Sequence, residues 1–539
     1  MHETKLNSTL RSSAFEVTDL VFKWRCRRLQ QDLKVAKYLS FLFQIMAATA
    51  KSQAVELEVE VTSSDPSVQD QHELELPPES PATKRSKLSL IPLIFVIYFE
   101  VSGGPYAEEP TVAAAGPFFA ILGFLIFPFV WSIPEALITA ELATAFPGNG
   151  GYVIWADRAF GPFWGWLMGY WKFLSGSIYN AAYPILCADY LKLVIPFFRG
   201  GRSRDLAIFF FNVVLIFLNF TGLTVVGYTA VALGVLSLLP FVLMFFISIP
   251  KLDPGRWVDL RHKGAKDWKL YITTLFWNLN FWDNASTLAG EVDQPQKTFP
   301  KALFYAAVIT CLGYLIPLFS GTGALKIDDS RWSDGFLAEA ASMIAGKWLK
   351  YMVEVGSLLS AVGMYEALLS SGSFQLLGTA EQGFLPKVMA ARSQRFGTPW
   401  VGILTSSTVT LSVSYMSYVD IISSANVLYG LGMLLEFATF VWLRRKCPSV
   451  KRPYKVPAGL SGVACMCVVP MGVVVFVIAS ARKMAYIIGG ALTVVGVIGY
   501  FAMCRCRDRG WMEFCERGVE ETQAEEMILH GVVPIPCFE

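Results

Sequence analysis

Two adjacent glutamates, Glu108 and Glu109, lie inside a long apolar segment of the chain. They directly follow a helix-breaking run of glycines and a proline in the stretch VSGGPYAEEP, residues 101–110. A carboxylate in hydrocarbon costs several kcal/mol unless a cation, a hydrogen-bond donor or water accompanies it. The chemistry that these residues suggest is the binding of a cation or of a proton.

Further acidic residues lie in other apolar segments, where matching bases are scarce. Lys172 is the one clear base within these segments. Such an excess of carboxyl groups requires cations, protons or both as partners. The acids are Glu100, Glu135, Asp283, Glu366 and Glu436 deep within the segments, and Glu141, Asp189, Glu291 and Glu354 nearer their ends.

Other kinds of chemistry have little support. The net charge is +2 and there is no basic groove, which argues against a nucleic-acid partner. The four histidines fall outside the apolar segments, and the cysteines lack the CxxC pairs of a zinc site. No nucleophile–base pair or phosphate-binding loop is visible. We therefore expect no enzymatic activity, no metal and no cofactor.

Membrane-spanning helices must position the acidic residues. The chain has 539 residues, of which 54% are hydrophobic and only 16% are charged. Apolar blocks long enough to cross a bilayer as helices recur along most of it. The sequence predicts an all-α polytopic membrane protein with about twelve spans, at 89–113, 118–144, 160–191, 205–222, 225–249, 270–292, 302–324, 346–376, 399–417, 419–443, 459–481 and 485–503.

Polar tails flank the apolar region. Residues 1–87 are mostly polar and are predicted to be a disordered tail, since the stretch 63–87 is rich in Ser, Pro and Glu. Residues 506–539 form a second tail. An even number of spans places both tails on one side, together with the basic loops after the eighth and tenth spans. The positive-inside rule then makes both termini cytoplasmic, although the basic loop at residues 251–269 disagrees.

Two spans are interrupted in corresponding positions. Span one breaks at Ser102, Gly103 and Gly104, and span six, five spans later, carries the polar run FWNLNFWDNAS at residues 276–286. Paired interruptions are typical of transporters built from two inverted repeats, with a binding site at the membrane midplane. We place a transporter domain at 88–505, with repeats at about 88–250 and 268–445 and two further helices at about 458–504.

Longer motifs occur in order along residues 88–505: GGPYAEEP, AELATAFPGNGGYVIWADRAFGPFWGW, FWDNASTLAGEVDQPQKTFPKAL, TAEQGFLPKVMA and RPYKVP. They resemble those of the plant polyamine uptake transporters, an L-type amino acid transporter-like branch of the amino acid–polyamine–organocation superfamily. The resemblance implies two inverted five-helix repeats with broken helices 1 and 6, and alternating access. It also implies proton-driven import of putrescine, spermidine or spermine, and cytoplasmic gating by Glu141 and Glu291.

The residues at the first break indicate which substrates the site does not bind. In relatives that carry amino acids, backbone N–H groups at this break hold the substrate carboxylate. Here Pro105 lacks an N–H, and Glu108 and Glu109 occupy the first turn of the next half-helix, so a carboxylate is repelled. One glutamate is expected to complement the helix dipole while the other faces the cavity, and the sequence leaves open which does which.

The candidate substrate-binding residues come from the two breaks. Asp283 is expected to bind an amine of the substrate, and Trp277, by its match to the superfamily pattern, to close over it. The full set is Ser102, Gly103, Gly104, Tyr106, Glu108, Trp277, Asn280, Trp282 and Asp283.

A proton gradient is the expected energy source, and a buried carboxyl group is the expected proton carrier because desolvation favours its neutral form. Glu135 and Glu366 are the candidates, with the far amine of the substrate or structural pairing as alternative roles. Some proton-coupled relatives use a lysine in span five, but span five has none here. Glu436 either pairs with Lys172 or is protonated.

The main alternative function is the transport or exchange of cationic or neutral amino acids. A further alternative is that the protein is a membrane sensor or the light subunit of a heteromeric complex. The loop after span three, LKLVIPFFRGGRSRD, has no cysteine, so no disulfide-linked heavy chain is expected. The expected partners are a polyamine, protons and the lipid bilayer. The expected location is the plasma membrane, with an endomembrane as the alternative. The preferred polyamine, the proton stoichiometry and the oligomeric state are left open.

Overall fold

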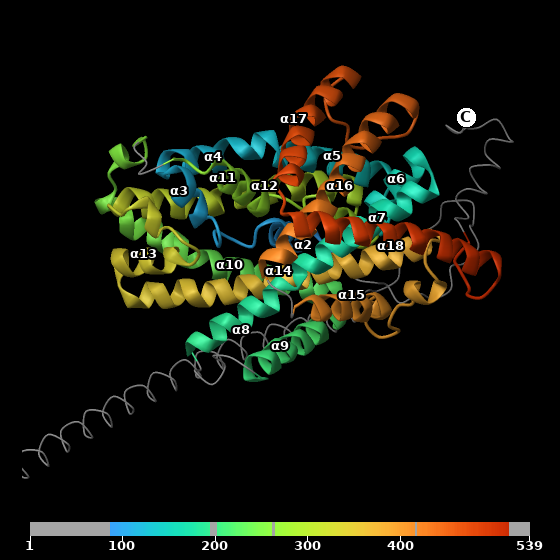
Figure 1. Cartoon of the computed structure of the whole chain (residues 1–539), viewed down its shortest axis with the longest axis horizontal. Coiled ribbons are helices and arrows are strands. Elements are labelled where there is room, and N and C mark those ends of the chain that lie inside the picture. The colour runs from blue at the N-terminus through green and yellow to red at the C-terminus, as the bar shows by residue number, and fades with distance from the viewer. Residues whose placement is uncertain (1–86, 195–201, 261–264, 415–417, 517–539) are drawn as a thin grey trace, which may run out of the picture. The chain divides into compact units, whose positions relative to one another are not determined.

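The computed structural model in Figure 1 describes residues 87–194, 202–260, 265–414 and 418–516. Within these ranges the side chains of 189–194 and 418–422 are not described. The tail predicted at 1–87 (apart from its last residue), residues 517–539 of the second tail, and the side chain of Asp189 lie outside the described residues.

The described residues form helices and short 3₁₀ turns without a strand. The first half contains α2 (Leu90–Val101), α3 (Glu109–Ala115), α4 (Pro117–Val130), α5 (Ser132–Ala145), α6 (Tyr152–Phe160), α7 (Pro162–Asn180), α8 (Ala182–Val194), α9 (Arg202–Phe220) and α10 (Leu223–Ser248). The second half contains α11 (Trp268–Asn278), η4 (Asn284–Glu291), α12 (Pro295–Ala324), α13 (Phe336–Ala345), α14 (Lys347–Glu381), η6 (Lys387–Ala390), α15 (Trp400–Val413), α16 (Tyr418–Lys446), α17 (Leu460–Ala479) and α18 (Lys483–Asp508).

Each predicted span coincides with one helix or with two consecutive elements of the described chain. Eight helical segments of the described residues are long and apolar enough to cross a membrane. The other predicted spans are divided or short: α2 with α3, α7 with α8, α11 with η4, and α15. The polytopic all-α prediction and the two broken spans are confirmed, whereas the boundaries of the two repeats stay a prediction. The short helices α6 and α13 were not predicted.

Prolines explain where two spans divide. A proline inside a helix clashes with the carbonyl four residues earlier. Helix α4 ends at Val130, four residues before Pro134, and α7 ends at Asn180, four residues before Pro184. Each chain resumes as a helix after one residue, so these are bends rather than the open breaks of spans one and six.

The two open breaks have different causes. In the first, Gly103 and Gly104 adopt positive φ angles of 64° and 125°, a region that glycine enters without steric cost. In the second, Phe281 adopts a φ of 70° although it is not glycine. Its N–H donates to the Tyr429 hydroxyl at 2.8 Å, so a tertiary hydrogen bond supports this conformation.

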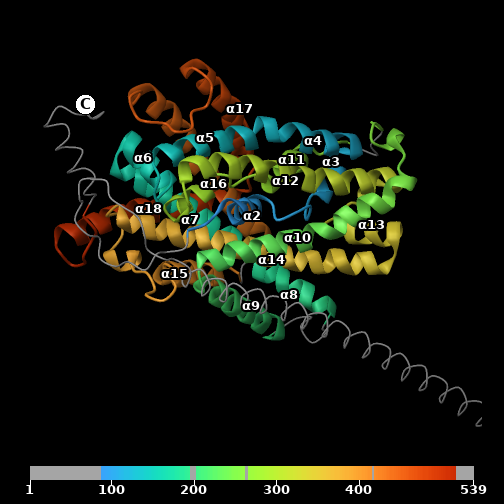
Figure 2. The ribbon, with the colours of Figure 1, turned by 180° about the vertical axis from the view of Figure 1, so that it is seen from behind.

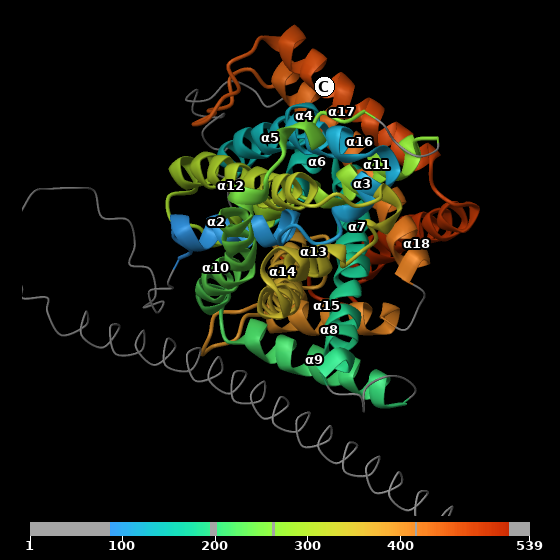
Figure 3. The same cartoon turned by 90° about the vertical axis from the view of Figure 1, so that its left-hand side faces the viewer.

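The helix packing brings the two breaks together. Helix α2 contacts α10 and α12, between which it is seen in Figure 3, and it also contacts α14. Helices α10 and α14 run side by side in the opposite views of Figures 1 and 2. Helix α14 further contacts η4, α7 and α8. This long helix therefore forms a wall against which both breaks and the α7–α8 span are assembled.

Candidate functional site

A cavity of about 560 Å³ lies beside the two helix breaks. Glu100 and Tyr106 line it from the first broken span, and Trp277 and Asn280 line it from the second. Small-molecule sites usually enclose about 300–1,000 Å³. The cavity therefore has room for a metabolite of modest size at the place where an interrupted-helix transporter carries its site.

The cavity leads from the protein surface to the interior. At one end it is lined by Asp205 of α9 and Asp334 of the loop before α13, and both are exposed. Deeper in it is lined by Glu100, which is only 2% exposed. We refer to the end with Asp205 and Asp334 as the mouth.

Two helices direct their C-terminal ends at this cavity. The last two residues of α2, Glu100 and Val101, line it, and so do the last two of α11, Trp277 and Asn278. A helix C-terminus carries roughly half a negative charge because its last carbonyl groups lack intrahelical donors. These two C-terminal ends favour a cation, whereas the first residues of α3 and α8, Glu109 and Ala182, and Gly335 before α13 bring helix N-termini to the same cavity.

Glu100 and Glu109 add carboxyl groups to the lining. Glu100 accepts a short hydrogen bond from the hydroxyl of Ser371 on α14. Oε1 of Glu109 accepts from the N–H groups of Gly335 at 3.2 Å and Leu337 at 3.3 Å, so this side chain caps the start of α13. Both carboxyls are thereby held in fixed positions.

Glu109, and not Glu108, is the neighbour that faces the cavity. Glu108 is fully buried and is not part of the lining, and neither of its carboxyl oxygens has a hydrogen-bond partner among the described residues. It occupies the N-cap position of α3, where a negative charge complements the helix dipole. The cavity-facing residue is therefore Glu109 and differs from the Glu108 of the candidate set, while the helix-dipole role of its neighbour stays a prediction.

The other predicted residues of the first break shape the cavity mainly through the backbone. Ser102 lines the cavity, and its hydroxyl accepts from the N–H of Gly104 at 3.3 Å. The carbonyl of Gly103 accepts from the Ser360 hydroxyl at 2.6 Å. Tyr106 lines the cavity and donates to the carbonyl of Ser237 at 3.3 Å.

Aromatic rings form one wall of the cavity. Trp277 stacks on Tyr179 with 4.5 Å between ring centroids, and Phe281 meets Tyr179 edge-on at 4.6 Å. The amide of Asn280 donates to the Tyr179 hydroxyl at 3.5 Å. Trp282, in contrast, is buried outside the lining, and its indole N–H donates to a carbonyl at 2.9 Å.

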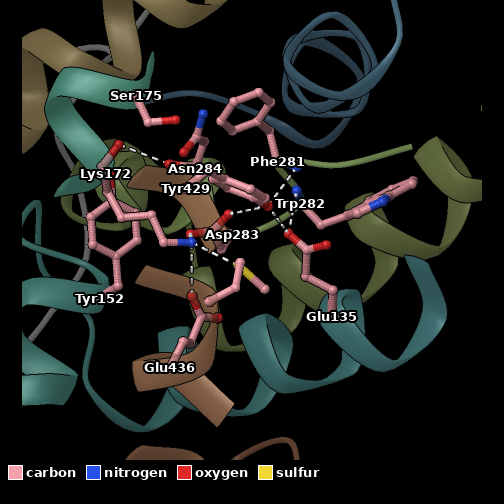
Figure 4. Close-up of polar contacts among 12 residues, drawn as sticks. Glu135, Tyr152, Lys172, Ser175, Phe281, Trp282, Asp283, Asn284, Tyr429 and Glu436 are labelled. Carbon is pink, nitrogen blue, oxygen red and sulfur yellow. Dashed lines mark hydrogen bonds and ion pairs between the residues drawn. The ribbon is translucent and has the colours of Figure 1, made fainter. Parts of the chain in front are cut away.

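Asp283 belongs to a separate buried ion cluster, shown in Figure 4. Its carboxylate lies 2.5 Å from Nζ of Lys172, and Glu436 lies 3.3 Å from the same nitrogen. The ammonium group also lies 4.3 Å from the ring centroid of Tyr429 and 5.4 Å from that of Tyr152. Of the two alternatives for Glu436, the pairing with Lys172 is confirmed. Asp283 does not line the cavity, and its cation partner here is the protein's own lysine.

Glu135 joins this cluster through Tyr429. Its Oε1 accepts from the Tyr429 hydroxyl at 2.7 Å and from the N–H of Trp282 at 3.0 Å. The Tyr429 hydroxyl lies 3.3 Å from Asp283, so one tyrosine connects both carboxyls with the second break. Glu366 lies apart from this network and accepts from the Asn219 amide at 3.0 Å.

Other ion pairs are formed by Glu141 and Glu291 with nearby arginines, and we refer to the part of the bundle with these ion pairs as the closed end. Glu141 of α5 binds Arg444 at 2.6 Å and Arg452 at 3.0 Å, and thus joins α5 to α16 and its following loop. Glu291 of η4 pairs with Arg392 at 2.7 Å and accepts from the Asn149 amide at 2.9 Å. These contacts join segments that are far apart in the sequence.

Several cavity residues were not singled out by sequence reasoning. Tyr179 and Asp334 carry no local signal, because only the packing brings α7 and the α12–α13 loop to the breaks. Glu100 does carry one, since it lies in the last helical turn before the first break. A carboxyl at the C-terminal end of a broken half-helix opposes the dipole and therefore requires a cation or a proton nearby.

Comparisons with known proteins identify a family of membrane transporters. Residues 88–500 match the family described as Amino acid permease. The chain is 46% identical to the polyamine transporter RMV1 of Arabidopsis thaliana, over 85% of this chain and 92% of that protein. It is 49% identical to the polyamine transporter PUT1 of Oryza sativa subsp. japonica, over 80% of this chain and 81% of that protein. An uncharacterised transporter of Legionella pneumophila is 25% identical over 72% of this chain.

Proposed function

Because this chain belongs to the amino acid permease family, we propose that it is a membrane transporter that imports polyamines by alternating access. The curated plant relatives named as polyamine transporters are 46% and 49% identical to it over most of its length. The observation that supports a polyamine as substrate is the negative charge of groups that line the cavity. Two helix C-termini and the carboxyls of Glu100 and Glu109 surround it.

The same observation argues against an amino acid as substrate. The carboxylate of an amino acid needs N–H donors or a cation, and the N-terminus of α3 is the natural place for it. Here Glu109 lies in the first turn of α3 and lines the cavity. Polyamines carry ammonium groups and no carboxylate, so they avoid this repulsion.

The conformation supports a direction of transport. The cavity reaches the surface at its mouth, whereas ion pairs of Glu141 and Glu291 tie segments together at the closed end. The basic residues Arg444, Arg445, Lys446 and Arg452 lie at the closed end, so the positive-inside rule makes that end cytoplasmic. The mouth then faces outward, both termini lie in the cytoplasm, and the plasma membrane is the proposed location.

Proton coupling is part of the proposal. Three carboxyl groups, of Glu135, Asp283 and Glu436, belong to one fully buried cluster, in which the Lys172 ammonium pairs with Asp283 and Glu436 and Tyr429 connects Glu135 to Asp283. Unpaired buried charge is costly, so protons are the natural further partners of these carboxyls. Glu135 stays a candidate proton carrier because, among the described residues, its carboxyl has a tyrosine hydroxyl and a backbone N–H but no cation in hydrogen-bond contact. Glu366, outside the cluster, is the second candidate.

Uptake into proteoliposomes tests the proposal. Purified full-length protein should take up labelled putrescine and spermidine. Uptake should be faster when a pH gradient drives protons into the vesicles than when there is no gradient. Unlabelled arginine and leucine should compete poorly. Competition by leucine equal to that by spermidine would refute the substrate class. Uptake indifferent to the pH gradient would refute the coupling and leave the substrate class intact.

A further inference from the structure

The cavity holds two carboxyl groups with the same unusual pattern of contacts. In Glu100 and in Glu109, one oxygen accepts a hydrogen bond from the protein. The other oxygen, Oε2 in both residues, is buried and has no partner in the part of the chain that the structure describes. Buried acceptors are nearly always satisfied, so an unpartnered one beside a cavity indicates where a ligand's donor belongs.

The two carboxyl groups lie at different depths. Glu100 is at the end of α2 and contacts Ser371, in the interior of the long helix α14. Glu109 is at the start of α3 and contacts the backbone of residues 335 and 337, next to the exposed Asp334 of the mouth. The residues of the first break, 102–108, separate the two positions along the chain.

The lining near the first break suits a hydrocarbon chain. Val101, Ala107 and Met364 line the cavity with apolar side chains, and Tyr106 adds an aromatic ring. Methylene groups bury favourably against such surfaces, and aromatic faces also tolerate an ammonium group close by. The cavity thus combines an inner and an outer acceptor with an apolar wall.

We propose that Glu100 and Glu109 form an inner and an outer ammonium subsite, so that the cavity selects substrates by the spacing of two charges. A diamine or a longer polyamine occupies both subsites, whereas a monoamine of similar length leaves one carboxyl unpaired. This inference rests on the proposed polyamine transport and adds to it a rule for substrate choice. Glu109 is then a specificity-determining residue.

Competition assays with matched amines test this rule. Proteoliposomes containing the full chain take up labelled putrescine while unlabelled putrescine, spermidine or n-butylamine competes. The wild-type protein should bind putrescine at least about tenfold more tightly than n-butylamine, because a charged hydrogen bond is lost with the monoamine. Equal competition by the two amines would overturn the inference.

The variant Glu109→Gln isolates the outer subsite. The glutamine oxygen can still accept from the N–H groups of Gly335 and Leu337, so the cap of α13 is retained while the charge is lost. The preference for putrescine over n-butylamine should fall by about tenfold or more. The control Glu339→Gln removes an exposed charge on the same helix α13, paired with Arg331 at 3.8 Å, and should keep the wild-type preference.

The outcomes separate this inference from the proposed function. Wild-type protein that takes up no polyamine refutes the function itself. Normal uptake with an unchanged preference in Glu109→Gln, or an equal loss in Glu339→Gln, refutes only the two-subsite rule. If Glu109→Gln does not fold, Glu109→Asp serves as the second variant. The shorter aspartate side chain keeps the charge but places the outer carboxyl farther from the inner subsite. The preference should then shift from putrescine toward spermidine. An unshifted preference in Glu109→Asp would also refute the rule.

Discussion

Replacing Lys172 with methionine removes the cation of the buried cluster while keeping most of the side-chain volume. In the native protein the Lys172 ammonium lies 2.5 Å from Asp283 and 3.3 Å from Glu436, and all three side chains are completely buried. Breaking a buried ion pair by removing one partner typically costs about 3–5 kcal/mol, because the remaining charge has no compensation. We expect Lys172→Met to lose stability in this range.

The free energy of unfolding can be measured on purified protein in mixed micelles with increasing denaturing detergent. Asp283→Asn should cost less than Lys172→Met, because the lysine keeps Glu436 as a partner. The double variant should cost less than the sum of the two single variants, since the second substitution removes a charge that the first left unpaired.

Two results would refute this reasoning. A Lys172→Met variant within about 1 kcal/mol of the wild type would mean that the carboxyls are already neutral or differently paired. Additive effects of Lys172→Met and Asp283→Asn would mean that the two groups do not interact.

Three further predictions follow from other contacts. Gly103→Ala should lower stability by about 1–3 kcal/mol in the same detergent assay, because φ is +64° and the new Cβ would lie 2.6 Å from a methionine side chain of α14; wild-type stability would contradict the observed break. Arg444→Gln removes the 2.6 Å ion pair with Glu141, so the closed end should open more often. In a variant whose only cysteine is Cys447, this opening would be measured as faster maleimide labelling. Unchanged labelling would show that this ion pair does not keep the end closed. Desolvation by the surrounding protein raises the pKa of Asp334 above its ordinary value, so its negative charge at the mouth is present above that raised pKa and is lost as pH falls through it. Spermidine affinity should therefore weaken with acidification less in Asp334→Asn than in the wild type.

Spans could be predicted from the sequence because their signal is local. Hydrophobic length gave all twelve positions, and Ser102, Gly103 and Gly104 marked the first break because glycine carries its conformational preference with it. The helices α6 and α13 were not predicted because they are too short to resemble a membrane span. The division of spans two and three could have been predicted, since Pro134 and Pro184 each end a helix four residues earlier.

The site was only partly predictable because its partners are distant in the sequence. Tyr106, Trp277 and Asn280 line the cavity as expected of residues beside breaks. The pairing of Asp283 with Lys172 joins positions 111 residues apart, and no local pattern indicates it. Which of two adjacent glutamates faces a cavity depends on the orientation of α3, which is set by packing and not by its own sequence.

The fixed carboxylates of the cavity have a consequence for the response to membrane voltage. Moving one elementary charge across 100 mV is worth about 2.3 kcal/mol. When Glu100 and Glu109 are ionised and a diamine fills the site, the loaded site is nearly neutral, so its reorientation is almost independent of voltage. The emptied site instead returns with two uncompensated negative charges, and an interior-negative potential drives them outward. The electrical energy of the membrane would then accelerate the return of the empty carrier, even though the substrate is what carries positive charge into the cell.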